Sequence, residues 1–89
     1  MKISRNFIYR KIAEEYLLIP MGKAALEVKG LIALSESGSL LVQKLRQDCT
    51  REELVAALRA EYDVSEAEAA EDVDAFLNQM RQLDMLVED

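Results

Sequence analysis

The chain contains no histidine and no tryptophan, and it has a single cysteine among its 89 residues. The absence of histidine removes the commonest general base and the commonest zinc ligand of proteins. Cys49, being alone, cannot form an internal disulfide or a multi-cysteine metal site. Its acidic neighbour Asp48 also disfavours a reactive thiolate. We therefore expect no catalytic residue, no metal site, no cofactor and no enzyme activity.

Long apolar runs are also absent from the chain. No run approaches the ~18 residues that a membrane span requires, and no apolar segment of signal-peptide type opens the chain. A lone thiol in a small acidic protein fits a reducing compartment, so we expect a cytoplasmic protein with no membrane partner. The length, without repeats or low-complexity linkers, predicts a single small domain over residues 1–89.

Charge is distributed unevenly along the chain. Residues 1–11 carry four basic side chains and no acidic ones, whereas residues 48–89 carry thirteen acidic and three basic ones, a net charge of −10. Nucleic-acid binding depends on neutralising phosphates with Lys and Arg, so the acidic half argues against a nucleic-acid partner. The basic N-terminal segment would instead help to steer an acidic peptide.

Three short apolar runs in the first third of the chain predict β-strands. They are rich in β-branched or aromatic residues or flanked by Gly and Pro, and they comprise Phe7–Ile12, Tyr16–Ile19 and Leu31–Leu34. Residues 13–15 are expected to turn the chain between the first two runs. Pro20 closes the second run, because Pro cannot donate a hydrogen bond to a sheet. The stretch between Gly22 and Gly30 carries no clear preference.

The remainder of the chain predicts three helices. Ser35 is expected to cap the first, whereas Thr50 with Glu53 and Ser65 with Glu68 match the capping box, in which two side chains satisfy exposed backbone donors reciprocally. The last helix is expected to run to about residue 83. Its apolar residues recur at helical spacing, namely Val73, Phe76, Leu77, Met80 and Leu83. Three strands followed by three helices predict an α+β fold that is winged helix-turn-helix-like.

Several short motifs resemble those of PqqD-like proteins in both order and spacing. The matching segments are LSESGSLL at 34–41, CTREELVAAL at 49–58, EYDV at 61–64, DVDAFL at 72–77 and LDML at 83–86. The similarity covers the chain from about Phe7 to Val87. Ser35 stands where Asn is usual in that family, and Asp84 stands where Gly usually follows the last helix. These departures suggest a different peptide partner.

The resemblance implies a three-stranded antiparallel sheet followed by three helices, in a recognition element for ribosomally made, post-translationally modified peptides (RiPPs). Such domains bind the leader of a precursor peptide and present its core to a maturase, often a radical SAM enzyme. In the family, the leader adds as an extra strand to the third strand, against the third helix. Carried onto this sequence, the resemblance implies a peptide-binding site at Leu31, Ile32, Ala33, Leu34, Asp72, Phe76, Gln79, Met80 and Leu83.

Two other hypotheses stay open. A winged-helix regulatory or DNA-binding domain would use Asn78, Gln79 and Gln82, which lie late in the last predicted helix. Self-association through the strand at 31–34 would give a homodimer that competes with peptide. Genes for a radical SAM protein, a peptidase or a short precursor beside this gene favour peptide binding, whereas salt-dependent binding to promoter DNA favours regulation.

Overall fold

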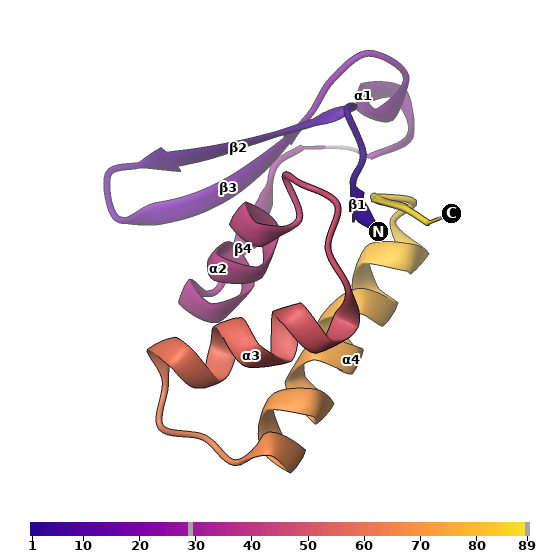
Figure 1. Ribbon diagram of the computed structural model, residues 1–89. Helices are drawn as coiled ribbons and strands as arrows, with labels where there is room; N and C mark the ends of the chain where they lie inside the picture. Colours follow the sequence, from indigo (N-terminus) through magenta and orange to yellow (C-terminus); the bar gives the residue numbers. More distant parts are fainter. Residues whose placement is uncertain (29, 89) are drawn as a thin grey trace.

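The computed structural model describes residues 1–28 and 30–88, and it places a small sheet against a set of helices (Figure 1). The described elements, in chain order, are β1 (Lys2–Ile3), β2 (Phe7–Ile12), β3 (Glu15–Pro20), α1 (Lys23–Glu27), β4 (Ile32–Leu34), α2 (Glu36–Lys44), α3 (Arg51–Glu61), α4 (Glu66–Gln82) and β5 (Leu86–Val87). The predicted α+β class is therefore confirmed. No described helix is long and apolar enough to cross a membrane.

The main sheet is antiparallel, with its strands in the order β2-β3-β4. β2 and β3 form a hairpin whose register runs from Phe7 opposite Pro20 to Ile12 opposite Glu15. β4 pairs with β3 over three residues, with Leu34 opposite Tyr16. These are the three strands that the sequence predicts. β4 therefore forms one edge of the sheet, and β2 forms the other.

Two features lie outside the prediction of three strands followed by three helices. β1 pairs with β5, so that Ile3 lies opposite Leu86, and this second sheet brings the two ends of the described chain side by side (Figure 1). The short helix α1 occupies the stretch after Gly22 for which the sequence gives no preference. Strands of two residues and a helix of five residues are too short to show a hydrophobic period.

The three long helices begin where their capping residues predict. The Ser35 hydroxyl accepts a hydrogen bond from the Gly38 N–H at 3.0 Å. Thr50 and Ser65 each form a complete capping box with the glutamate three residues later. These bonds satisfy backbone donors that the first turn of a helix otherwise leaves open.

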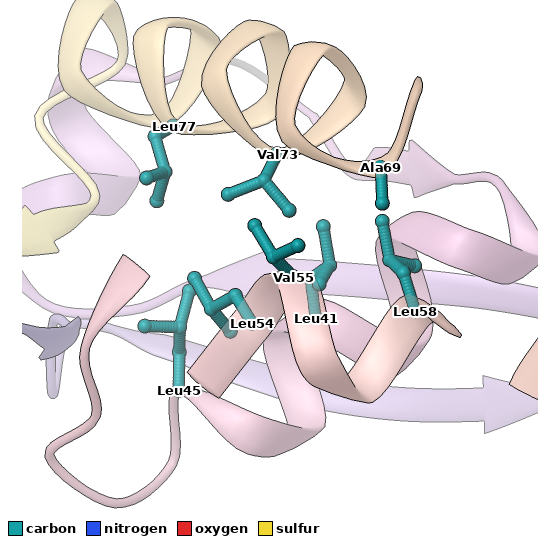
Figure 2. Packing of buried hydrophobic residues seen from close by; sticks show 8 residues of the cluster. All are labelled: Leu41, Leu45, Leu54, Val55, Leu58, Ala69, Val73 and Leu77. Atoms are coloured by element: carbon teal, nitrogen blue, oxygen red, sulfur yellow. The ribbon is translucent and has the colours of Figure 1, made fainter. Parts of the chain in front are cut away.

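The core is divided into two apolar clusters. The first packs α2, α3 and α4 together, and its side chains point toward one another between the helices in Figure 2: Leu41, Leu45, Leu54, Val55, Leu58, Ala69, Val73 and Leu77. The second joins the sheet to the helices through Phe7, Leu18, Ala24, Val42, Met80 and Met85. Phe76 packs against both clusters. The helices thus fix α4 in position, and the sheet is attached to that frame.

The end of α4 offers a test of backbone strain. Asp84 has a φ of 55°, and its N–H donates to the Arg81 carbonyl while the Met85 N–H donates to the Met80 carbonyl. This is the Schellman arrangement, in which Gly is preferred because a Cβ is strained at positive φ. We expect Asp84→Gly to raise the free energy of unfolding by about 0.5–1 kcal/mol, measured by thermal denaturation.

The matched control for that variant is Asp84→Ala, which removes the carboxylate but keeps the Cβ. It should give no gain in stability, because the alanine suffers the same strain at positive φ. Equal stabilisation by Gly and Ala would show that the charge of Asp84, and not its backbone conformation, limits stability.

Candidate functional site

The outer edge of β4 is open to another extended chain. Within residues 1–28 and 30–88, β4 pairs only with β3. Ile32 and Leu34 are half-buried against the second core cluster, whereas Ala33 is exposed and Leu31 is 57% exposed. This alternation gives β4 one face on the protein interior and one toward solvent. Its unpaired backbone groups form a template to which a further strand can be added.

One face of α4 packs against the same core cluster as β4. We call the side chains on this face the stripe. Asp72, Phe76, Gln79 and Leu83 follow one another at intervals of four and three residues, which places them on one face of the helix. Phe76 and Leu83 are half-buried and pack against the same cluster as the inward side chains of β4. Asp72 and Gln79 are exposed. The stripe therefore combines an apolar base with polar groups that solvent can reach.

Among the predicted site residues, only Met80 has a side chain that solvent cannot reach. Its side chain is 0% exposed and lies in the second core cluster. It follows Gln79 directly, which turns it away from the stripe and toward the buried face of α4. Met80 therefore supports the stripe from beneath and does not line it.

A depression of about 280 Å³ opens between the α4 stripe and the start of α2. Its lining residues are Ser35, Ser37, Gly38, Leu41, Leu58, Asp72, Ala75, Phe76 and Gln79. A Cβ added at Gly38 would lie 3.1 Å from the Ser35 hydroxyl and 3.8 Å from the side chains of both Leu34 and Phe76. Three predicted residues of α4 thus line the hollow, and Leu34 at the end of β4 lies beside it through Gly38 without lining it. We call this hollow, together with the β4 edge, the groove.

Sequence reasoning missed the part of the groove that α2 and α3 contribute. Ser37, Gly38 and Leu58 line it, yet each is explained locally as a helix residue or a core residue. Gly38 gave the only signal, because Gly inside a helix is destabilising unless the missing side chain is needed elsewhere. The sequence indicates only a capping role for Ser35 and gives no sign that it lines the groove.

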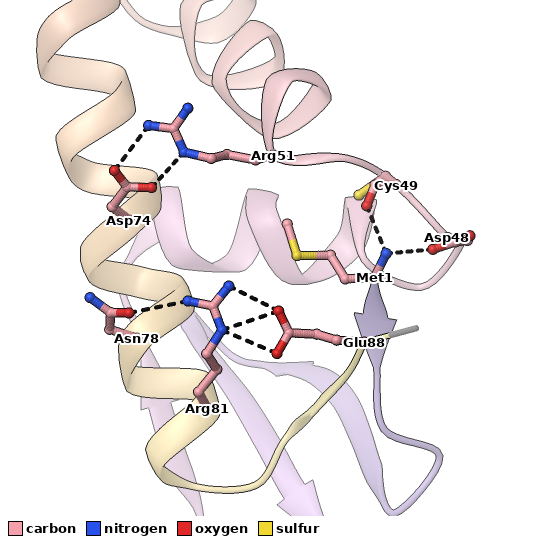
Figure 3. A network of polar contacts seen from close by, with 8 residues as sticks. All are labelled: Met1, Asp48, Cys49, Arg51, Asp74, Asn78, Arg81 and Glu88. Carbon is pink, nitrogen blue, oxygen red and sulfur yellow. Dashed lines mark hydrogen bonds and ion pairs between the residues drawn. The ribbon is translucent and has the colours of Figure 1, made fainter.

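The opposite flank of α4 carries paired charges (Figure 3). Arg51 binds the Asp74 carboxylate through two hydrogen bonds of 2.6 and 2.9 Å. Arg81 contacts both Glu88 and Asn78. The guanidinium groups lower the pKa of Asp74 and of Glu88 below their ordinary values. These exposed pairs tie α3 and the C-terminal segment to α4, away from the Asp72–Leu83 stripe.

Cys49 lies at the start of α3 and is half-buried. Burial, followed by the carboxylate of Glu53, raises the pKa of its thiol. A raised pKa disfavours the thiolate, which is the reactive form of cysteine. In the described part of the chain, no group of three or more His, Cys, Asp or Glu side chains is arranged to hold a metal ion.

Comparisons with known proteins identify the family. The model of the family described as coenzyme PQQ synthesis protein D (PqqD) matches residues 15–86. One similar solved structure is TbiB1 in complex with the TbiA(beta) leader peptide, with a TM-score of 0.79, 27% identity and 100% of both chains covered. Another is lasso peptide synthetase B1 complexed with the leader peptide.

The second structure has a TM-score of 0.77 and 17% identity, and the match covers 98% of this chain and 96% of the other, so it supports the fold alone. No curated protein sequence matches significantly. The family match spans most of the chain and includes β3, β4 and the three long helices. It confirms the resemblance seen in the sequence motifs. The chain therefore belongs to the PqqD family.

Proposed function

We propose that this protein is a RiPP recognition element that binds the leader of a ribosomally made precursor peptide and presents the peptide to a separate modifying enzyme. It is a single domain and catalyses no reaction itself. The observation that carries the proposal is the open edge of β4 beside the α4 stripe. The family match and the fold shared with TbiB1 in its leader complex support the same function.

The geometry suits strand addition. A leader in extended conformation would bond to the free N–H and C=O groups of β4, which gives affinity with little demand on sequence. Every second leader side chain would then face the groove, since side chains alternate along a strand. Phe76 and Leu83 offer apolar contacts there, and Gln79 and Asp72 offer polar ones. Met80 contributes indirectly, because its buried side chain holds this part of α4 against the core.

The type of modifying enzyme is a separate part of the proposal. The sequence resemblance implies a radical SAM maturase, and we propose an enzyme of this type as the partner. The genes beside this one test this part of the proposal, because a radical SAM gene next to a short precursor frame would support it and a modifying enzyme of another type would contradict it.

The test is a titration of isotopically labelled protein with the leader encoded beside its gene, followed by nuclear magnetic resonance. We expect the backbone amides of residues 31–34 and 72–83 to shift, because they border the groove. A scrambled leader of the same composition is the control. Binding that shifts only amides of β2, at the opposite edge of the sheet, would refute the proposed site, and an absence of shifts would refute the function.

The two alternatives predict different results. A homodimer through β4 would shift the amides of residues 31–34 when the protein is concentrated without peptide, and the leader would reverse that change. A regulatory domain would instead bind promoter DNA with an affinity that falls steeply as salt is added.

A further inference from the structure

A second depression continues the groove beyond the end of β4. Its volume is about 370 Å³, and it is lined by Ser35, Glu36, Ser37, Leu58, Tyr62, Val64 and Asp72. Four of these residues also line the first depression, namely Ser35, Ser37, Leu58 and Asp72. A peptide that leaves the β4 edge beyond Leu34 therefore meets this second hollow next. We call it the acidic pocket, for the charges described below.

The inner wall of the acidic pocket is apolar. Leu58 is 2% exposed and belongs to the first core cluster, and Tyr62 and Val64 pack partly buried against that cluster. The connector between α3 and α4 supplies Tyr62 and Val64, and its position is fixed by the bond from the Tyr62 N–H to the Leu58 carbonyl. A wall of this kind favours a ligand with an aliphatic or aromatic portion.

The mouth of the acidic pocket carries two carboxylates. Glu36 and Asp72 are both exposed, and among the described residues no basic group pairs with either of them. Asp74 and Glu88, by contrast, are held by arginines. The Tyr62 hydroxyl already shares a hydrogen bond with Glu36, but neither carboxylate is neutralised by a cation. Since carboxylates form their strongest hydrogen bonds with charged donors, this mouth favours a cationic ligand group.

Neighbouring groups add to the negative potential of the acidic pocket. Burial, the charge of Glu36 and the hydrogen bond with its carboxylate, and the charge of Glu61 raise the pKa of Tyr62. No Lys or Arg lines the pocket. The N-terminus of α2 opposes this potential with roughly half a positive charge. Two full negative charges outweigh it, and Glu36 itself lies in the first turn of α2.

None of the basic residues near the N-terminus lines the acidic pocket. Arg10 and Lys11 lie on β2, which is the far edge of the sheet from β4. Lys11 lies over the ring of Tyr16, 5.4 Å from its centre, and Tyr16 lines a neighbouring hollow with Glu36 and Tyr62. Lys11 therefore lies on the side of the sheet that borders Glu36, but it does not line the acidic pocket. The local charge at the end of the groove thus differs from the preference for acidic peptides that the N-terminal segment suggests.

We propose that the acidic pocket binds the side chain of an arginine or lysine of the leader, at a position just beyond the segment that pairs with β4. The aliphatic stem of that side chain packs against Leu58, Tyr62 and Val64, and its cationic end lies between Glu36 and Asp72. Long basic side chains routinely combine these two kinds of contact. The link to a leader rests on the proposed function, whereas the preference of the pocket for a cation does not.

The first experiment tests the pocket without any leader. The probes are Nα-acetyl-arginine N-methylamide and its citrulline analogue, which has nearly the same shape but no charge. Both are titrated while the methyl signals of Leu58 and Val64 are recorded. Exposed ion pairs are individually weak, so we expect the arginine probe to bind roughly two- to thirtyfold more tightly than citrulline. Equal affinity of the two probes would overturn the proposal.

The second experiment changes the protein. The double variant Glu36→Gln and Asp72→Asn should lower the affinity for the arginine probe to that for citrulline. The control is Glu52→Gln with Glu71→Gln, two exposed acids on α3 and α4 that line neither the groove nor the acidic pocket. This control changes the net charge equally and should leave the preference intact. A parallel loss in both variants would attribute the preference to overall charge and overturn the proposal.

The third experiment applies the same variants to the leader, with each of its basic residues replaced in turn by norleucine. One replacement should weaken binding to the unaltered protein roughly two- to thirtyfold and have no effect on the Glu36/Asp72 variant. A leader that shifts the amides of residues 31–34 without such coupling would refute the pocket and leave the proposed function standing. If the protein prefers the arginine probe to citrulline but binds no leader, the proposed function is refuted and the cation preference of the acidic pocket stands.

Discussion

N-methylation of successive leader residues is expected to reduce binding in strict alternation along the peptide. A strand added to β4 points every second N–H toward β4 and the others toward solvent. Methylation at a residue of the first kind removes a hydrogen bond and leaves a β4 carbonyl without its partner. The cost in binding free energy is roughly 1–3 kcal/mol, which corresponds to a Kd that is roughly five- to 150-fold larger.

Methylation at a residue of the second kind should change affinity by less than about threefold, because that N–H faces water in the complex. Fluorescence anisotropy with a labelled leader measures both sets, and each methylated peptide has its neighbour as the matched control. A helical leader in the groove would instead be sensitive with a period near 3.6 residues. Either that period or a uniform loss would contradict strand addition.

Truncation of Leu77 to alanine is expected to give the largest loss of stability. Leu77 is 1% exposed and lies in the cluster that packs α4 on α2 and α3 (Figure 2). Removing its buried methyl groups leaves a cavity, and such changes lower the free energy of unfolding by about 2–5 kcal/mol. For a domain of this size each kcal/mol corresponds to roughly 4–8 °C in Tm. Chemical and thermal denaturation followed by circular dichroism measure the effect.

The control for Leu77 is Leu26→Ala on α1. The chemical change is identical, but Leu26 is 82% exposed. Its truncation should therefore change the free energy of unfolding by no more than about 0.5 kcal/mol. A loss at Leu26 comparable to that at Leu77 would show that packing between α4 and the other helices does not dominate stability.

Local patterns predicted those elements whose causes are local. A capping residue and the glutamate three positions later are enough to start α3 and α4, so Thr50 and Ser65 located both helices correctly. The hairpin of β2 and β3 was equally readable, because its apolar runs and Pro20 lie within a few residues of one another. β1 and β5 were missed because Ile3 and Leu86 gain strand structure only from each other.

The predicted site also combines features that local spacing predicts with features that depend on tertiary packing. Helical spacing placed Phe76, Met80 and Leu83 in one broad apolar stripe, and the family resemblance added Gln79, but spacing alone does not tell which edge of a stripe is buried. The structure turns Met80 into the core and leaves Gln79 exposed. Glu36 and Tyr62 of the acidic pocket were not predicted as site residues, since they meet Asp72 only after α2, α3 and α4 have packed.

The sequence by itself determined the family, the strands of the main sheet and the starts of the three long helices, because each depends on residue type and short-range spacing. Only the tertiary structure decided which side chains of α4 are buried, which hollows α2, α3 and α4 form together and which acids pair with arginines. These properties arise from contacts between segments far apart in the chain. The first core cluster, which contains Leu77, holds α2, α3 and α4 in the positions that create them.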